Sequence, residues 1–299
     1  MEKRRTDLAV EAAQLWREGS AGELRGVEQT ESTREGYPVT TVRIVDEEGA
    51  KAIGKPVGTY VTITLDGLAR REEDAFGRAA RAVAAELNAL LKLPEGAPAL
   101  VVGLGNRAIT PDNIGPAAAD HTMVTRHLVE QVPEHFGSFR PVAALAAGVL
   151  GTTGVESGEL VRAVTEKIRP SCVIAVDALA SRSLSRVCNT IQLADTGITP
   201  GSGVGNARVA LDRRSLGVPV IAVGVPTVVD GATLAADLLA EAGQADLDPQ
   251  ALQGAGEGVL VTPRDIDAKV TDLAKVVGFG INLALQPGLT VEDVELFLS

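Results

Sequence analysis

The sequence is poor in several residue types, and each shortage excludes a class of protein. It has one Trp, two Tyr and five Phe among 299 residues, so Ala, Val, Leu and Ile must build the core. The two cysteines, Cys172 and Cys188, cannot form a disulfide framework or a zinc site by themselves. No apolar run approaches the roughly 18 residues of a membrane helix, and the start MEKRRTDLAVEA has no apolar signal core. We therefore expect a cytoplasmic protein without a membrane partner.

Positive charge is also in short supply. The chain has 28 Lys and Arg against 39 Asp and Glu, which gives a formal net charge of −11. Binding to nucleic acid phosphates needs clustered Lys and Arg, so we expect no direct nucleic-acid partner. Hydrophobic residues make up 45% of the chain and charged residues 22%, as in ordinary globular proteins. The length suits one large α/β domain or two ordinary ones, and we expect one.

The order of apolar segments predicts that fold class. Near-continuous apolar runs alternate with helical patterns, which indicates an α/β three-layer sandwich with a mainly parallel central sheet. The first 38 residues are polar apart from a helical pattern at 8–17, and residues 244–258 are expected to form a surface excursion. Strands are predicted at 40–45, 57–65, 99–105, 141–147, 172–177, 189–195 and 218–226, and further helices at 75–92, 115–131, 156–168, 227–241, 263–286 and 291–299, with a short helical segment after residue 177.

Three aspartates follow predicted strands. Asp112 lies beyond the strand 99–105, Asp177 ends the run CVIAVD, and Asp195 ends NTIQLAD. Ligands of open α/β sheets gather at the carboxyl ends of parallel strands, so these carboxylates are predicted to share one edge as an acid site. The alternative is structural, because an Asp before a helix is often an N-cap and an Asp at the edge of a sheet is often only solvated.

Other motifs are less informative. The segment GLGNRA has Ala108 where a dinucleotide fingerprint needs its third glycine, and GSGVGN lacks the Lys-Ser/Thr of a P-loop. We expect Gly201 and Gly203 to form a tight loop whose backbone N–H groups face a substrate. Asp195-Thr196-Gly197 spells the signature of pepsin-like proteases, but those all-β enzymes need two such loops.

The remaining nucleophiles and ligands do not form recognisable sites. The three histidines, at 121, 127 and 135, do not have the spacing of a metal cluster. The two cysteines are expected to be buried and apolar, and the serines at 181, 183 and 185 lack a nucleophile elbow.

Long blocks of the chain resemble the germination proteases of spore-forming bacteria. The blocks are RTDLAVEA, TTVRIVDEEGAKAIGKPVGTYVTI, VVGLGNRAITPDNIGP, VTRHL, VIAVDALASRS, TIQLADTGITPGSGVGN, GVPVIAVGVPTVVD and INLALQPG. They cover nearly the whole chain apart from residues 244–258. The family also resembles the hydrogenase-maturation endopeptidases, which use equivalent acids around a metal.

The resemblance implies an atypical aspartic endopeptidase of the spore core that degrades small acid-soluble spore proteins. It further implies a homotetramer made as an inactive zymogen. The family's catalytic aspartates match Asp112, in the Thr110-Pro111-Asp112 segment, and Asp177. Family substrates are cut between an acidic and an apolar residue, so we expect self-cleavage between Asp7 and Leu8. Residues 1–7 would then be a propeptide and 8–299 one peptidase domain.

An Asp pair can activate water without a metal or cofactor. Two like charges about 4 Å apart repel by about 4 kcal/mol at an effective dielectric of 20, or roughly three pKa units. Such a pair holds one proton near neutral pH, and the sequence leaves open which Asp is the base. Two alternatives stay open. One is a metal-assisted peptidase with Asp195 or a histidine as third ligand, and the other is a non-catalytic binder of spore proteins.

Overall fold

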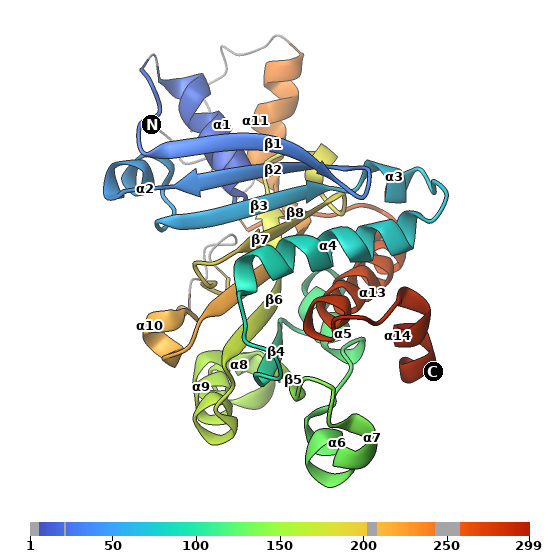
Figure 1. The fold of residues 1–299 in the computed structure, drawn as a ribbon. Coiled ribbons are helices and arrows are strands. Elements are labelled where there is room, and N and C mark those ends of the chain that lie inside the picture. The colour runs from blue at the N-terminus through green and yellow to red at the C-terminus, as the bar shows by residue number, and fades with distance from the viewer. Residues whose placement is uncertain (1–5, 21, 202–207, 243–257) are drawn as a thin grey trace.

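The architecture is described from a computed structural model, which covers residues 6–20, 22–201, 208–242 and 258–299. Within these residues nine strands form one sheet in the order β1-β2-β3-β7-β8-β6-β4-β5, with β9 paired to β8 (Figure 1). The strands are β1 (Val27–Arg34), β2 (Tyr37–Ile44), β3 (Gly58–Thr64), β4 (Ala99–Leu104), β5 (Val142–Gly148), β6 (Cys172–Ser181), β7 (Thr190–Ala194), β8 (Val220–Asp230) and β9 (Leu260–Val261).

Helices flank this sheet on both faces, so the α/β class is confirmed. The longer helices are α1 (Ala9–Gly19), α4 (Ala75–Leu91), α9 (Ser157–Ile168), α11 (Gly231–Glu241), α13 (Ile266–Leu285) and α14 (Val291–Leu298). The shorter ones are α2 (Glu47–Ile53), α3 (Asp66–Ala69), η1 (Thr110–Asp112), α5 (Ile114–Asp120), α6 (Arg126–Gln131), α7 (Pro133–Phe136), α8 (Leu150–Thr153), η2 (Leu184–Arg186) and α10 (Arg213–Leu216). Among the described helices, none has both the length and the apolar character that a bilayer-spanning segment needs.

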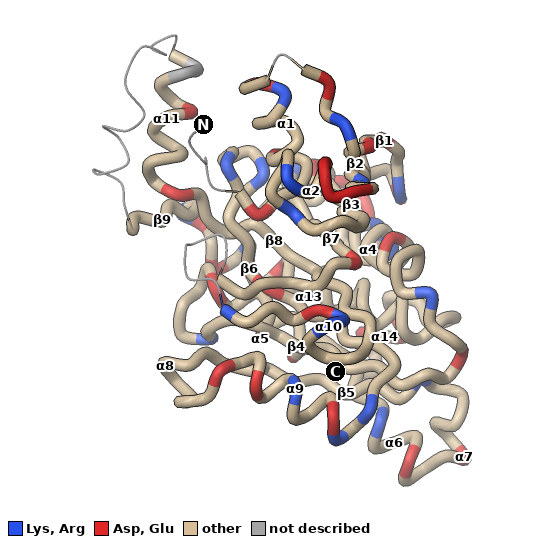
Figure 2. The backbone as a smooth tube through the Cα atoms, turned by 90° about the vertical axis from the view of Figure 1, so that its left-hand side faces the viewer, with Lys and Arg blue, Asp and Glu red and all other residues tan. Residues whose placement is uncertain are grey.

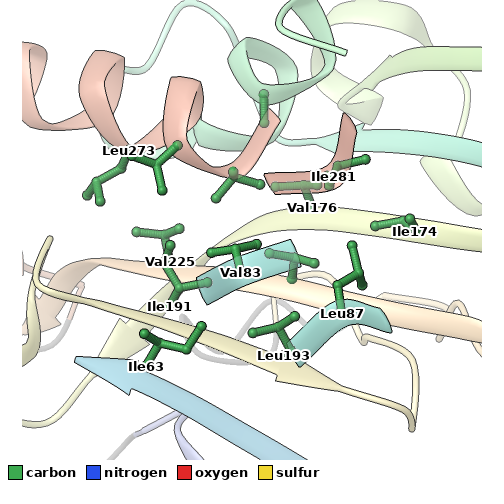
Figure 3. Close-up of a cluster of buried hydrophobic side chains, with 14 of the residues drawn as sticks. Ile63, Val83, Leu87, Ile174, Val176, Ile191, Leu193, Val225, Leu273 and Ile281 are labelled. Atoms are coloured by element: carbon green, nitrogen blue, oxygen red, sulfur yellow. The ribbon is translucent and has the colours of Figure 1, made fainter. Parts of the chain in front are cut away.

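The largest core lies between the sheet and helices α4, α5 and α13. Figure 3 shows aliphatic side chains of α4 and α13 meeting those of β3, β6, β7 and β8 in this layer. The opposite face is covered by α1, whose first turn packs on β2, β3 and β6, and by α9, which packs on β4 and β6. Aliphatic residues dominate both layers, as the scarcity of aromatic residues required.

The expectation of a mainly parallel sheet is wrong for half of the molecule. β5, β4, β6 and β8 are parallel, whereas β1, β2, β3 and β7 continue the sheet by antiparallel pairing. The connection 182–189 between β6 and β7 is shorter than the dozen or so residues of a parallel crossover. The reversal of β7 therefore follows from loop length, which the strand-like composition of 189–195 does not reveal.

Several element boundaries also differ from the predicted ones. β1 was not predicted, because this edge strand is largely exposed and lacks apolar alternation. β6 extends to Ser181 and β8 to Asp230, where helical residues were expected. The predicted helix 115–131 is broken between α5 and α6, where Asn282 of α13 accepts from Met123 N (2.8 Å) and donates to His121 O (2.8 Å).

Charged side chains lie mostly at the periphery of the described chain. Figure 2 shows Lys and Arg interspersed with Asp and Glu along the helices and loops, while the central strands carry few charges. An acidic residue inside this sheet therefore stands out, and β6 carries one.

Candidate active site

Asp112 lies in the loop that follows β4. Gly105 turns the chain there with φ 116°, and a Cβ at this position would lie 2.0 Å from the Asp112 carbonyl oxygen, so only glycine fits. Asn106 N donates to Asp112 Oδ2 at 2.8 Å and so fixes the carboxylate. Burial raises the pKa of Asp112, and the hydrogen bond from Asn106 opposes this shift.

Asp177 lies inside β6 and is 6% exposed. Its neighbour Val176 pairs with Gly103 near the end of β4, so Asp177 lies beside the loop that carries Asp112. Burial raises the pKa of Asp177 well above its ordinary value, and the carboxylates of Asp112 and Asp7 raise it further, while a hydrogen bond from Ala178 N opposes the shift. The structure thus brings Asp112 and Asp177 within electrostatic reach of each other.

Asp195 does not join this pair, so the expected common edge of three carboxylates is wrong. β7 runs antiparallel to β8, so the carboxyl end of β7 lies level with the start of β8. Asp195 therefore lies at the opposite end of the strands from the carboxyl ends of β4 and β8. The Asp195 side chain is exposed and accepts from Thr59 N at 2.8 Å. Its carboxylate thus fastens β7 to β3.

The other predicted supporting residues have different outcomes. Thr110 begins η1, where its carbonyl oxygen accepts from Asn113 N at 3.1 Å, and so helps to hold the turn that presents Asp112. Gly201 adopts φ 73°, in the left-handed region that favours glycine. Gly203 lies outside the described residues, so the expectation of backbone donors there stays a prediction.

The N-terminal segment lies along the extended part of β6. Asp7 N donates to Ala180 O at 2.9 Å, and Ala180 N donates to Asp7 Oδ2 at 2.9 Å. Leu8 is fully buried between α1 and the sheet, in one cluster with Leu179. The predicted processing bond between Asp7 and Leu8 therefore lies along β6 beyond Asp177, next to Ala180. The Asp7 carboxylate adds to the raised pKa of Asp177, after burial and Asp112.

A second acidic side chain of this segment is bound in the same way. Glu11 is 2% exposed and accepts from Arg182 N at 2.7 Å and from Ser183 N at 3.1 Å. Thr6 Oγ1 also donates to Glu11, and Arg186 Nε lies 3.5 Å from its Oε1. The chain just beyond β6 thus recognises an acidic residue four positions after Asp7.

Gln192 and Lys55 complete the surroundings of the segment. Gln192, in β7, donates from Nε2 to Asp7 O at 3.1 Å and accepts at Oε1 from Ala9 N at 2.7 Å. Burial lowers the pKa of Lys55, while the negative charges of Asp7 and Glu11 oppose this shift. A cavity of about 1160 Å³ opens beside Asp7 and Gln192.

The sequence prediction missed the roles of Glu11, Lys55 and Gln192. The usable signal was Gln192, since a polar residue within the buried run NTIQLA needs a hydrogen-bond partner. Lys55 and Glu11 lie in polar stretches of the sequence, where a charged residue does not point to a buried hydrogen-bond partner.

The residues that were set aside as ligands and nucleophiles do not form a second site. In the described part of the chain, no three His, Cys, Asp or Glu side chains converge in a group that could hold a metal. The metal-assisted alternative needed Asp195 or a histidine as a third ligand, and among the described residues neither joins Asp112 and Asp177 in such a group. The described residues therefore do not fit a bound metal ion. Cys172 and Cys188 are buried, as expected, and burial raises their pKa values to about 12 and about 11.

Comparison with known proteins identifies the family. The model of the family described as germination protease matches residues 4–244. A germination protease of Clostridium perfringens is 44% identical, with 99% of each chain covered, and one of Caldanaerobacter subterraneus is 44% identical with 98% of each covered. The chain belongs to the germination protease family. A more distant germination protease, from Bacillus velezensis, is 38% identical over 97% of this chain and 95% of its own. Membership in this family makes the chain an endopeptidase of spore germination.

Proposed function

We propose that this germination protease is an aspartic endopeptidase in which Asp112 and Asp177 activate a water molecule. The observation that carries the proposal is the placement of the buried Asp177 beside the loop that holds Asp112. The raised pKa of Asp177, caused by burial and then by the carboxylates of Asp112 and Asp7, supports it. Shifted carboxylates with a charged partner in a cleft are typical of catalytic acids and bases. No metal or organic cofactor takes part in the proposed step.

The surroundings of the two carboxylates support different roles for them in the proposed mechanism. Asp177 is almost fully buried and keeps the shared proton, because burial penalises its charged form most strongly. Asp112 is partly exposed and accepts from Asn106 N, which favours its charged form. Asp112 is therefore the base and Asp177 the acid.

The reaction then follows the chemistry of peptide hydrolysis. Asp112 takes a proton from water while the water oxygen bonds to the carbonyl carbon of the substrate. Asp177 donates its proton to the departing amide nitrogen as the C–N bond breaks. The products are a carboxyl group on one fragment and an amine on the other. The pair again holds one proton, the one that Asp112 took from water, and is ready for the next reaction after the products leave.

The first substrate of this site is the chain itself. Asp7 is bound through its main chain and its carboxylate by Ala180, which supports cleavage of the bond between Asp7 and Leu8. The chain is then a zymogen whose maturation removes residues 1–7, leaving 8–299 as the peptidase domain.

Substrates cut in trans share the recognition pattern of this segment. An acidic residue, then an apolar residue, then a second acidic residue match the contacts made to Asp7, Leu8 and Glu11. Small acid-soluble spore proteins of the spore core are the proposed substrates, by the family resemblance, and a homotetramer is the proposed assembly.

Intact mass before and after mildly acidic incubation tests the proposal. Wild type should lose the mass of residues 1–7, and Asp177→Asn should keep its full mass. Loss of the same segment from both proteins would refute the role of Asp177. An unchanged mass in wild type would refute self-processing at Asp7.

A further inference from the structure

Gln192 is the one side chain in the described residues that hydrogen-bonds the main chain on both sides of the Asp7–Leu8 bond. Its Nε2 donates to the Asp7 carbonyl oxygen, which belongs to that bond, at 3.1 Å. Its Oε1 accepts from Ala9 N, on the other side of Leu8, at 2.7 Å. One planar amide therefore fixes three consecutive residues of the segment.

The register of the sheet places this amide opposite the catalytic acid. Gln192 pairs with Gly224 across β7 and β8, and Gly224 pairs with Asp177 across β8 and β6. Directly paired residues project from the same face, so Gln192 and Asp177 share one face on either side of a glycine. Two strand spacings separate their backbones by about 10 Å. The Leu179 side chain lies over the intervening Gly224, where a Cβ would come within 2.3 Å of Leu179 Cδ1.

Burial makes the hydrogen bond to the carbonyl oxygen effective. Gln192 is 7% exposed, and its neighbours Ile191 and Leu193 anchor β7 in the core on the opposite face. A donor that is held in place and shielded from water stabilises the negative charge that develops on a carbonyl oxygen during attack.

We propose that Gln192 is a further catalytic residue, which donates from Nε2 to the oxyanion of the tetrahedral intermediate and registers the substrate through Oε1. This inference rests on the proposed cleavage between Asp7 and Leu8. Water attack moves an electron pair of the C=O bond onto the oxygen, the hydrogen bond from Gln192 shortens, and the pair returns when the C–N bond breaks. Because both contacts are to main-chain atoms, any substrate peptide with this backbone path receives the same two hydrogen bonds.

The test uses the full chain and a synthetic peptide of residues 4–12, RRTDLAVEA. In Gln192→Met, which removes both hydrogen bonds at similar volume, the first-order rate of self-processing and the kcat for the peptide should fall about 100-fold. Gln192→Glu keeps the acceptor for Ala9 N and should lose kcat with a smaller change in KM. Gln14→Met, in an exposed position of α1, is the matched control and should behave as wild type.

A change in the substrate tests the second contact without altering the protein. Replacing the Leu8–Ala9 amide of the peptide by an ester removes the N–H group that donates a hydrogen bond to Gln192 Oε1. In wild type this should lower kcat/KM about fivefold, and in Gln192→Met it should have less than a twofold effect. Equal effects in both proteins would overturn the contact to Ala9 N.

Mass spectrometry of the fragments distinguishes a failure of the role of Gln192 from a failure of the proposed cleavage between Asp7 and Leu8. If wild type cuts between Asp7 and Leu8 and Gln192→Met cuts there at the same kcat, the inference on Gln192 is overturned and the proposed function stands. If wild type never cuts that bond, both are overturned. If Gln192→Met raises only KM, the residue binds substrate but does not stabilise the transition state.

Discussion

Replacing Asp177 by Asn should stabilise the protein, and the gain should grow with pH. The native state binds the Asp177 proton more tightly than the unfolded chain, because burial and two neighbouring carboxylates raise the pKa of Asp177. Unfolding above the ordinary aspartate pKa therefore releases a proton, and the free energy of unfolding of wild type falls as the pH rises. This loss begins near pH 3.9 and ends at the raised pKa of the folded state.

The magnitude follows from the linkage relation. Each pH unit within this window removes up to about 1.4 kcal/mol from the free energy of unfolding of wild type. Asn has nearly the same shape and no proton to lose, so Asp177→Asn escapes this slope. At about 2 °C per kcal/mol for a chain of this size, its Tm advantage should grow by up to about 3 °C for each pH unit within this window.

The assay is thermal unfolding of both proteins at pH 4, 5, 6 and 7, with intact mass showing that the wild-type chain is still unprocessed. Asp195→Asn is the control, because Asp195 is an exposed aspartate away from the Asp112–Asp177 pair. A Tm difference for Asp177→Asn that stays constant from pH 4 to pH 7 would refute the claim that Asp177 retains its proton in the fold.

Three further predictions concern activity. Asp112→Asn should fold normally and keep residues 1–7, whereas Asp195→Asn should self-process like wild type. Intact mass follows both variants, and processing by Asp112→Asn would exclude Asp112 as the base. The rate of peptide cleavage should rise as Asp112 loses its proton, above the ordinary aspartate range, and fall as Asp177 loses its own, so a pH profile with no alkaline decline would contradict the assignment of the acid. Lys55→Met should reduce the preference for Asp over Asn at position 7 of the peptide about tenfold, or about 1.4 kcal/mol, measured as a ratio of kcat/KM values; an unchanged ratio would show that Lys55 does not read the acidic side chain.

The sequence predicted the buried strands and the longer helices because apolar runs and helical periodicity are local properties. It also predicted Asp112 and Asp177 as residues of an acid site, since polar residues that follow apolar runs can be recognised in the sequence. It failed where the outcome depends on pairing between distant strands. The reversal of β7 moved Asp195 to the other edge of the sheet, and the polar strand β1 is held by its partner β2 rather than by burial. No local pattern reveals that Gln192 contacts Asp7 and Ala9, or that Glu11 of the same segment contacts the main chain just after β6.

The extended part of β6 explains how one strand can combine chemistry with recognition. Strand pairing would normally occupy the main-chain groups past Asp177, but the register between β6 and β8 shifts between Leu179 and Ala180. Such a shift re-aims main-chain groups, and here Ala180 offers both its N–H and its carbonyl to Asp7. The same Asp7 offers its carbonyl oxygen to the amide of Gln192. If the proposed cleavage holds, we expect specificity for an acidic residue and placement of the bond to be cut to depend on the same irregularity of one strand.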